Sequence, residues 1–472
     1  MKVLLIQPPY VDLKKNSKRC QPPLGLVYLA AAIEDQNTVE ILDAVVEGFE
    51  NEIIIDDKYI QYGLSYEDIK KRIRKYNPDV IGISCLFTTQ VNNVYDLARE
   101  VKKISPKIAV VVGGAHPSAL PEEVLKVKEI DYAVIGEGEK SLKELLACIN
   151  NKSYPENIAG IAYKKNGKII INEKKYYIED LDSIPFPNWS LLPLERYFEI
   201  GKPHGLYPEK KRFLPILSSR GCPNKCIFCS VHNLWGKKYR KRSAKNVLDE
   251  IRELIEKYGI EEIYFEDDNM TLDKQRTKDI LNGMINEKLN IKWSSPNGIF
   301  AGSVDENIIN LMKKSGCRAI SFGIESGDKH MLKDVIDKNV DLEKTISFIR
   351  KAKSLNIETS AFFVLGLPGE TAATLKNTLK YASRLPADNI AFFFATPLPG
   401  TRLRNICDDM GIAPNTLDYK DLRSENPLLV PEDMSMWAFL FQVRKAKFAI
   451  YAKKALRNPR WIVNKIREKL LK

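Results

Sequence analysis

SSRGCPNKCIFCS, at Ser218–Ser230, places three cysteines within eight residues near the middle of the chain. Cys222, Cys226 and Cys229 have the spacing CxxxCxxC, and thiolate runs of this kind are the usual signature of an iron–sulfur cluster. A structural zinc site is the alternative, because such sites take four Cys or His ligands and His232 follows Cys229 by three residues. The motif therefore predicts a metal centre held mainly by thiolates.

The sequence around this motif alternates apolar strand patterns with helix patterns. The expected strands are Leu214–Ser218, Glu262–Glu266, Ile291–Ser294, Ala319–Ile324, Glu358–Leu365 and Asn389–Phe394. Helices fit between them, for example at Ala244–Tyr258 and Leu342–Ser354. Residues 206–420 are therefore expected to form a partial (β/α)6 barrel. Barrels carry their chemistry on the loops after the strands, and the cysteine motif directly follows the first strand.

Residues 1–150 show the same alternation and predict a doubly wound, Rossmann-like α/β domain. The expected strands are Lys2–Ile6, Val39–Ala44, Asp79–Phe87, Ile108–Gly113 and Asp131–Ile135. Their near-continuous apolar character indicates burial on both faces, as in a parallel sheet. Open sheets of this kind bind ligands beyond the carboxyl ends of their strands. No GxGxxG follows the first strand, which argues against a dinucleotide.

Two further regions break the alternation. Residues 151–205 are expected to form a linker that packs between the domains, with a hairpin at Gly160–Asn172 that turns at Asn166-Gly167. Residues 421–472 are expected to be helical. Two helical patterns, Met434–Leu456 and Pro459–Leu471, are separated there by a proline, which ends a helix.

Composition limits the class of protein. The chain has 472 residues, 44% of them hydrophobic, which predicts two or three domains. Five cysteines lie scattered outside the motif, so a disulfide scaffold is not expected. No uncharged apolar run approaches the roughly 18 residues of a membrane helix, and the apolar start of the chain is a strand rather than a signal peptide. These features predict a cytoplasmic protein. The net charge of +12 is read as solvated surface lysine, since no nucleic-acid motif is present.

The cysteine motif, with aromatic Phe228 before its last cysteine, resembles the signature of radical S-adenosylmethionine (SAM) enzymes. Three thiolates on a cubane leave one iron free to chelate the amino and carboxylate groups of a methionine moiety. The resemblance implies a [4Fe-4S] cluster ligated by Cys222, Cys226 and Cys229. It also implies bound SAM, which is cleaved reductively to a 5′-deoxyadenosyl radical.

Residues downstream of the motif match positions at which the radical SAM family holds SAM. Asp267 and Asp268 follow the second barrel strand, where the family binds the SAM amino group, although Asp also commonly caps helices. Glu325 ends the fourth strand and is implied to meet polar groups of SAM, with a solvated carboxylate as the alternative. Gly366, in LGLPGE, lies where the family flanks the adenine, or it marks a plain turn. Arg240 is implied to meet the SAM carboxylate, with surface charge as its alternative.

The front domain resembles the cobalamin-binding module that precedes many radical SAM domains. The matching segments are Gln7-Pro8-Pro9, PPLG at Pro22–Gly25, GGAHP at Gly113–Pro117 and GEGE at Gly136–Glu139. The residues that this resemblance implies at the cofactor are Pro8, Pro9, Gly25, Ser84, Gly113, Gly114, His116, Gly136 and Gly138. The DxHxxG motif of the mutase-type fold is absent, so the resemblance implies cobalamin without a protein histidine on its lower face. A structural role beside Pro117 is the alternative for His116.

The combined resemblance implies a cobalamin-dependent radical SAM methyltransferase. In the family's mechanism one SAM methylates reduced cobalamin, a second SAM yields the radical that removes hydrogen from an unactivated carbon, and methylcobalamin donates the methyl group. A cobalamin-bearing radical SAM oxidoreductase or cyclase that transfers no methyl remains open. So does a zinc-stabilised binding protein with a basic face.

The partners that follow are a small-molecule, lipid or peptide substrate and an electron donor such as flavodoxin or ferredoxin, with no nucleic acid. The C-terminal region mixes Lys and Arg with aromatic residues, among them Trp437, Phe441 and Phe448. A basic amphipathic helix can lie on a membrane surface, which motivates peripheral membrane contact and a lipid substrate as a hypothesis. A helical cap that closes the barrel is the alternative.

Overall fold

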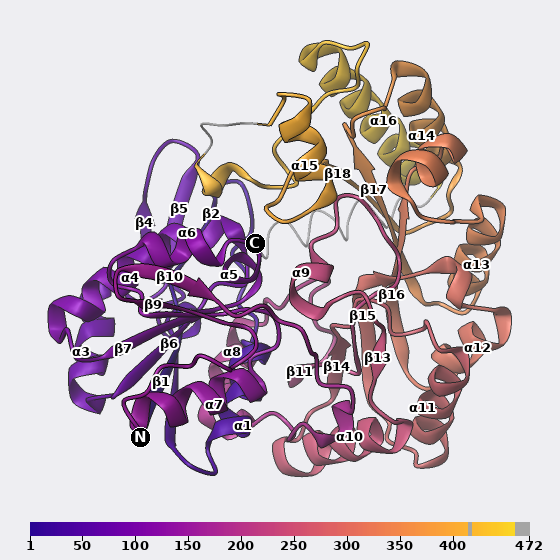
Figure 1. Ribbon diagram of the computed structural model, residues 1–472. Coiled ribbons are helices and arrows are strands. Elements are labelled where there is room, and N and C mark those ends of the chain that lie inside the picture. The colour runs from indigo at the N-terminus through magenta and orange to yellow at the C-terminus, as the bar shows by residue number, and fades with distance from the viewer. Residues whose placement is uncertain (414–417, 458–472) are drawn as a thin grey trace.

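The computed structural model describes residues 1–413 and 418–457, and it contains two mainly parallel sheets side by side, each with its helices (Figure 1). The front sheet has the order β10-β9-β8-β7-β6-β1-β3. Its parallel strands are β1 (Lys2–Gln7), β3 (Thr38–Asp43), β6 (Val80–Ser84), β7 (Ala109–Gly113) and β8 (Tyr132–Val134). All five expected strands are therefore present, each shorter or shifted by a few residues at most.

Helices cover both faces of the front sheet, as the doubly wound prediction requires. Alternate residues of β1 point to opposite sides: Val3 and Leu5 join the core with α1, whereas Leu4 and Ile6 join the core with α3 and α4. The helices of this domain are α1 (Leu24–Ile33), α2 (Ala44–Glu47), α3 (Tyr66–Tyr76), α4 (Val91–Ile104), α5 (Ala115–Ala119), α6 (Pro121–Lys126) and α7 (Glu139–Asn150), with a 3-10 turn at Thr88–Gln90.

The expected linker hairpin forms, but it belongs to the front sheet instead of packing between the domains. Strands β9 (Ile161–Lys165) and β10 (Lys168–Ile171) pair with each other, and β9 pairs antiparallel with β8. Without the hairpin, β8 would expose unpaired backbone groups along an edge, which proteins commonly cover. The rest of the connection holds two 3-10 turns and helix α8 (Leu194–Ile200), and Trp189 is buried there.

A small antiparallel sheet was not predicted. It consists of β2 (Tyr10–Leu13), β5 (Tyr59–Tyr62) and β4 (Glu52–Ile54), in the order β2-β5-β4. These strands are short, β2 lies far from the other two in the sequence, and all three residues of β4 are exposed, so no alternating pattern marks them. The sheet contacts the segment after the barrel, because Tyr59 Oη donates to Asp421 Oδ1 at 2.6 Å.

The second sheet is the predicted partial barrel. Six parallel strands follow one another in chain order and do not close: β11 (Phe213–Ile216), β14 (Glu262–Phe265), β15 (Lys292–Ile299), β16 (Cys317–Glu325), β17 (Glu358–Leu365) and β18 (Asn389–Phe394). The helices on its outside are α10 (Ala244–Tyr258), α11 (Lys274–Asn286), α12 (Glu306–Lys314), α13 (Leu342–Ser354) and α14 (Ala372–Arg384) (Figure 1). Ser, Asp or Thr side chains cap each of these helices.

The cysteine motif lies inside a short two-stranded hairpin, β12 (Ser219–Arg220) and β13 (Arg240–Lys241), with α9 (Val231–Trp235) between the strands. After the barrel come α15 (Arg402–Asp409) and α16 (Met436–Arg457), and α16 packs on α14. The second helix expected there, Pro459–Leu471, lies outside the described residues.

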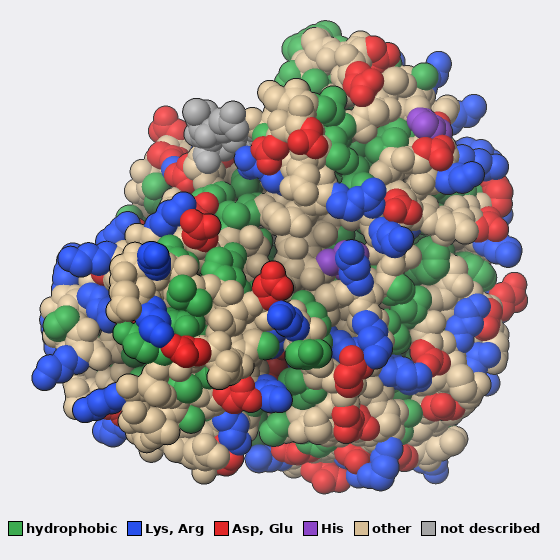
Figure 2. Space-filling view, in the orientation of Figure 1, with side chains coloured by type: hydrophobic (Ala, Val, Ile, Leu, Met, Phe, Trp, Pro, Cys, Tyr) green, Lys and Arg blue, Asp and Glu red, His purple; other side chains and the backbone are tan. Residues whose placement is uncertain are grey.

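The surface mixes charges of both signs. On the face shown in Figure 2, Lys and Arg side chains are spread over both domains and are interspersed with Asp and Glu. This distribution agrees with solvated surface lysine. Within the described part of the chain no helix is long and apolar enough to span a bilayer.

Candidate functional site

The three motif cysteines lie at the carboxyl end of the first barrel strand as free thiols. Cys229 N donates to Cys226 O at 3.1 Å, and buried Ile227 anchors the loop by donating to Ile336 O at 3.2 Å. His232, the fourth ligand that a zinc site requires, has its Nε2 2.9 Å from the backbone oxygen of Cys222. The loop therefore presents three thiols, while the imidazole is engaged with the backbone.

The surroundings of the motif cysteines favour protonated thiols when no metal is bound. Burial, with smaller contributions from neighbouring thiols and Glu325, raises the pKa of Cys226 and of Cys229 to about 12. Bare thiols in this place are therefore protonated at neutral pH, and iron must displace their protons. Each cysteine interacts electrostatically with the other two, so the thiols lie near one another, but the described residues do not bring three ligating side chains into metal-binding distance. Phe228 is half-buried and packs against the main core.

A buried ion pair that the sequence did not predict lies beside the thiols. Lys338 Nζ donates to Glu325 Oε1 at 2.7 Å and to Gly323 O at 2.8 Å. Burial lowers the pKa of Lys338, but Glu325 and the nearby Cys226 outweigh burial and raise it, so the amine stays charged. Glu325 Oε2 has no protein partner among the described residues, and Glu325 has a φ of 68°, which is rare for a side chain of this size. Glu325 therefore presents one free carboxylate oxygen close to the cluster loop.

The two neighbouring aspartates have different surroundings. Asp267 is buried and accepts hydrogen bonds from Ser218 N at 3.1 Å, from Ser218 Oγ at 2.7 Å and from Ser219 Oγ. It therefore fixes the entry to the cysteine loop and is not placed to receive a SAM amino group. Asp268 is half-buried and its Oδ2 accepts from Gly221 N at 3.2 Å. Burial raises the pKa of Asp268 to about 7, with the charge of Asp267 adding to the effect.

Gly366 has a structural reason to be glycine. Its φ is +82°, and a Cβ there would lie 2.7 Å from Leu429 O, so it admits the backbone of the segment after the barrel. Its N–H donates to Glu370 Oε2 at 2.5 Å. The close approach of two backbone segments explains why Gly366 is glycine, and its expected contact with adenine stays a prediction.

Arg240 contacts the front domain. Its Nη1 donates to Glu137 Oε1 at 2.6 Å and to Ile178 O at 2.8 Å, and its guanidinium lies 5.1 Å from the Tyr177 ring centroid. The side chain is almost fully buried by these partners. The structure thus gives Arg240 a place in the interface between the domains, not beside a SAM carboxylate.

The ligand edge of the front sheet is open at some of the expected positions and filled at others. Gly25 is exposed, with open space where a Cβ would be, and Ser84, Gly113 and Gly114 are half-buried at the strand ends. Pro8 and Pro9 are buried. A Cβ on Gly138 would lie 2.8 Å from Leu29 Cδ2, and one on Gly136 would lie 3.2 Å from Leu234 O, so protein atoms pack against both.

His116 is buried and is not available as a cobalt ligand. Its Nδ1 lies 3.3 Å from Thr88 Oγ1 and its ring meets the edge of Tyr419. Burial lowers its pKa to about 4, so the imidazole is neutral. The structural alternative for His116 fits these contacts.

Two apolar side chains that we did not predict extend from the same edge. Leu86 is 49% exposed and Phe87 is 53% exposed, directly after β6. A flat macrocycle with apolar faces can be covered by such a surface. Sequence could not separate these residues from the buried strand, because DVIGISCLF reads as one continuous apolar run.

A polar cluster joins the two domains at the mouth of the barrel; we name it the Glu266 cluster. Glu266 follows β14, and its Oε1 accepts from Gln21 Nε2 of the front domain at 3.1 Å. Glu266 Oε2 accepts from Asn297 Nδ2 at 3.0 Å and lies 3.3 Å from His204 Nδ1. Burial lowers the pKa of His204, but the bond and charge of Glu266 outweigh burial and raise it. The His204 side chain is 51% exposed, so its other nitrogen can meet a ligand.

Comparison with known proteins places both domains in families. Residues 10–146 match the B12 binding domain and residues 216–382 match the Radical SAM superfamily. Cytidylyl-2-hydroxyethylphosphonate methyltransferase of Streptomyces wedmorensis is 32% identical over 461 residues, which is 91% of this chain and 86% of the relative. An uncharacterized methyltransferase of Pyrococcus horikoshii is 33% identical over 458 residues, covering 96% and 92%.

More distant proteins share the whole architecture. Anaerobic magnesium-protoporphyrin IX monomethyl ester cyclase of Rubrivivax gelatinosus is 27% identical and covers 100% of this chain and 81% of the relative. The structure of the radical SAM methyltransferase TsrM from Kitasatospora setae, with cobalamin and a [4Fe-4S] cluster bound, is similar with a TM-score of 0.69 at 20% identity, covering 92% and 83%. Together with the cysteine loop and the open sheet edge, these matches show that the chain belongs to the cobalamin-dependent radical SAM methyltransferases, whose cofactors are a [4Fe-4S] cluster, SAM and cobalamin.

Proposed function

We propose that the substrate is a small, polar, oxygen-rich molecule that binds at the Glu266 cluster, between the front domain and the barrel mouth. The single observation that carries this proposal is the His204–Glu266 pair, which is held from both domains and is half-exposed at that place. When bound, the cluster and SAM supply a carbon-centred radical and cobalamin supplies the methyl group. The electrons come from a reduced protein such as flavodoxin or ferredoxin.

The chain's own groups have distinct parts in this proposal. Asp268 accepts a hydrogen bond from the amino group of SAM. Glu325, which Lys338 orients, contacts other polar groups of SAM. Leu86 and Phe87 cover one face of the corrin, and Gly25 leaves room for its edge. His204, Gln21 and Asn297 supply the donors that orient an oxygen-bearing substrate.

The relative from Streptomyces wedmorensis supports the substrate class, because its name describes a nucleotide-linked hydroxyethylphosphonate. Such a molecule carries negative charge and hydroxyl groups. Glu266 raises the pKa of His204 and so favours its protonated form. A protonated imidazole donates a strong hydrogen bond to an anionic oxygen of a ligand. We therefore expect phosphorylated or phosphonate-bearing small molecules to bind with higher affinity than apolar ones.

Turnover with a defined substrate panel tests the proposal. Holoenzyme reconstituted with iron, sulfide and cobalamin is given SAM, a low-potential reductant and cytidylyl-2-hydroxyethylphosphonate, and methylated product is measured by mass spectrometry. His204→Gln should raise KM for this substrate roughly tenfold or more, because one charge-assisted hydrogen bond is lost. The rate of 5′-deoxyadenosine formation should stay largely unchanged. His330→Gln, on an exposed helical turn outside the barrel, is the matched control. An unchanged KM in His204→Gln contradicts this placement of the substrate.

A cyclisation or oxidation without methyl transfer is the second candidate function. The observation that favours it is the likeness to the cyclase of Rubrivivax gelatinosus across the whole chain. The two functions differ in one product: methyl transfer consumes two SAM molecules and yields S-adenosylhomocysteine, whereas the alternative yields no methylated substrate. Quantifying S-adenosylhomocysteine against 5′-deoxyadenosine during turnover separates them.

We further propose that α16 contacts an anionic membrane surface. The helix contains no acidic residue and six Lys or Arg. One of its faces buries Phe439 and Val443, while Trp437 is 74% exposed, Phe441 52% and Phe448 77%. A helix that is apolar on both faces needs a partner on each, and basic helices with exposed aromatic residues fit the headgroup region of anionic bilayers.

Liposome flotation tests this contact. Full-length protein should float with anionic vesicles at low salt, and the double variant Trp437→Ser, Phe441→Ser should not. The control is Ile53→Ser, Ile54→Ser, which removes two equally exposed apolar side chains from β4. Equal flotation of both variants, or none by the natural chain, is evidence against α16 as the membrane contact.

A further inference from the structure

We propose that Glu137 is a positioning residue that clamps both ends of the cysteine loop onto the cobalamin-binding sheet. The clamp consists of Glu137 and Glu139 from the front domain and Arg220 and Arg240 from the barrel. It fixes the spacing between the iron–sulfur site and the corrin site. This inference rests on the two-cofactor chemistry of the family and not on the identity of the substrate.

One carboxylate oxygen holds both arginines. Glu137 Oε1 accepts from Arg220 Nη1 at 3.0 Å and from Arg240 Nη1 at 2.6 Å. Arg220 and Arg240 face each other across the hairpin β12–β13. The cysteine loop, residues 221–239, is the connection of this hairpin, so a single carboxylate ties together its entry and its exit.

The clamp makes further hydrogen bonds, although Glu139 Oε2 and Arg240 Nε are buried without a partner among the described residues. Glu137 Oε2 accepts from Ile178 N at 2.9 Å, and Arg220 Nη2 donates to Glu139 Oε1 at 2.6 Å. Two negative and two positive charges therefore compensate one another. Each of the four side chains is at most 9% exposed, so the bonds are shielded from water and salt.

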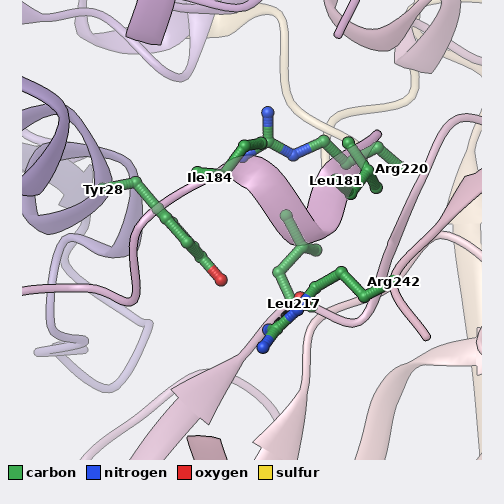
Figure 3. Close-up of a pocket in the computed structure, with 6 residues that line it drawn as sticks. All are labelled: Tyr28, Leu181, Ile184, Leu217, Arg220 and Arg242. Atoms are coloured by element: carbon green, nitrogen blue, oxygen red, sulfur yellow. Dashed lines mark hydrogen bonds between the residues drawn. The ribbon is translucent and has the colours of Figure 1, made fainter. Parts of the chain in front are cut away.

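Aromatic rings enclose the arginines from both domains. The Arg220 guanidinium lies 5.5 Å from the ring centroid of Tyr28 in α1 and 4.7 Å from that of Trp235 in α9. Figure 3 shows Tyr28 reaching from the front domain toward a small cavity that Arg220 and Arg242 border on the barrel side. These flat contacts restrict the arginines to one orientation, which a flexible surface pair would not do.

A buried ionic cluster is an expensive way to join two domains. Apolar side chains of the same volume often stabilise an interface equally well or better, because buried charges lose hydration. Directional hydrogen bonds, however, define a geometry that apolar packing leaves adjustable. Glu137 stands in GEGE directly after β8, at the sheet end where ligands bind, and Gly221 with Cys222 follows Arg220 immediately. The clamp thus links the end of β8 to the first residues of the cysteine loop.

The chemistry makes this spacing important. The radical formed beside the iron–sulfur cluster must reach a substrate carbon, and the same carbon must lie close to the methyl group that the corrin carries. Displacement by about 1 Å can lower a rate by roughly 100-fold. Loosening the clamp should therefore lower methyl transfer to the substrate. Formation of 5′-deoxyadenosine at the cluster and binding of cobalamin should both persist.

Glu137→Gln tests the clamp in the full-length holoenzyme. The amide retains the shape, but its NH2 group must face either the arginines or Ile178 N, so at least one bond is lost. We expect product methylation to fall roughly 10- to 100-fold, while 5′-deoxyadenosine formation stays within about two-fold. We also expect a spectroscopic change without any substrate. Fast relaxation of the reduced cluster should broaden the cob(II)alamin electron paramagnetic resonance signal less in the variant, because the two centres are held less closely.

Glu262→Gln is the matched control. Glu262 is a fully buried carboxylate that pairs with Arg318 at 3.0 Å, but this pair lies at the amino ends of the barrel strands and within one domain. Its removal should cost stability without changing the ratio of 5′-deoxyadenosine to methylated product. If Glu137→Gln does not fold, Glu137→Asp keeps the charge and shortens the reach, and the same ratio and signal are measured there.

Three results overturn the proposal. The first is a Glu137 variant with the natural product ratio and the natural signal width. The second is an equal loss of 5′-deoxyadenosine and methylated product with full cluster content, which assigns Glu137 to the cluster half alone. The third is the same uncoupling in Glu262→Gln, which makes it a general consequence of lost stability. A wrong substrate class is distinguishable, because it abolishes product in the natural chain yet leaves the spectroscopic comparison intact.

Discussion

Lys338 sets the local charge beside the three thiols, and its replacement has a measurable consequence. In Lys338→Met the cation is lost while Glu325 stays, which leaves an unpaired buried carboxylate and costs about 3–5 kcal/mol of stability. Without the cation the oxidised cluster is favoured, so its reduction potential should become more negative. A potentiometric titration measures this shift. Lys313→Met, on the outer helix α12, should leave the potential unchanged.

Glu370 predicts a pH dependence of stability. Burial raises its pKa to about 7, although the hydrogen bond from Gly366 N opposes the rise. The folded chain therefore keeps a proton that the unfolded chain releases near pH 4.5, so this group's contribution to stability falls as pH increases from about 4.5 to 7. Since one pKa unit corresponds to about 1.4 kcal/mol, the loss is at most about 3 kcal/mol. Glu370→Gln should gain thermal stability relative to the natural chain at pH 8 and little at pH 5. Equal gains in thermal stability at pH 5 and pH 8 would show that the pH dependence does not come from Glu370.

Single residues also mark how far sequence reasoning reaches. The thiolate spacing is local, so Cys222, Cys226 and Cys229 could be proposed as cluster ligands without any knowledge of tertiary contacts. Asp267 and Asp268 differ by one position, and only the hydrogen bonds from Ser218 and Ser219 decide which of them faces inward. The partner of Arg240 lies 103 residues away in the chain, which no local pattern reports.

At the level of elements, the cysteine loop depends on one glycine. Gly221 has a φ of +82°, and a Cβ there would lie 2.4 Å from Lys238 O. Gly221→Ala should therefore distort the loop beyond the cost of the dihedral angle alone, with a loss of iron measured in the reconstituted protein. Gly167→Ala, in the turn of the hairpin β9–β10, is the control, because its φ is +75° but no atom lies within 4 Å of the added Cβ. That control should cost only about 1–2 kcal/mol and bind iron normally.

Elements were predictable where periodicity was long and regular. The strands at Glu358–Leu365 and Asn389–Phe394 and the helix at Ala244–Tyr258 have the expected bounds, because each is a continuous pattern with clear ends. The small β2-β5-β4 sheet was missed, since the pairing of β2 with β5 is non-local and the strands have only three or four residues. The hairpin β9–β10 was found, but its pairing with β8 is a tertiary choice that its own sequence does not encode.

For the whole molecule, the relation between the two domains is the property that sequence could not supply. The front domain meets the barrel at the clamp, at the Glu266 cluster and at the segment after the barrel. All three use polar side chains from distant parts of the chain. Polar contacts of this kind fix an orientation, and one continuous apolar core that includes side chains of both the front domain and the barrel packs the two together. The fold class was therefore predictable, and the geometry between the cofactor sites was not.

The third of these contacts gives the last prediction. Arg423 is buried, and its Nη1 donates to Asp12 Oδ1 at 2.9 Å and its Nη2 to Val11 O at 2.6 Å, so it ties the end of the barrel to β2. Arg423→Met should leave Asp12 buried without its cation and cost about 3–5 kcal/mol. Since one apolar core extends through both domains, the loss should lower the thermal unfolding of the front domain and the barrel together, which calorimetry measures as one transition. Arg404→Met, which removes an exposed pair with Asp408 inside α15, should cost less than about 1 kcal/mol. If Arg423→Met instead lets the domains separate before either unfolds, seen by limited proteolysis in the connecting segment, then the polar contacts and not the shared core hold the domains together.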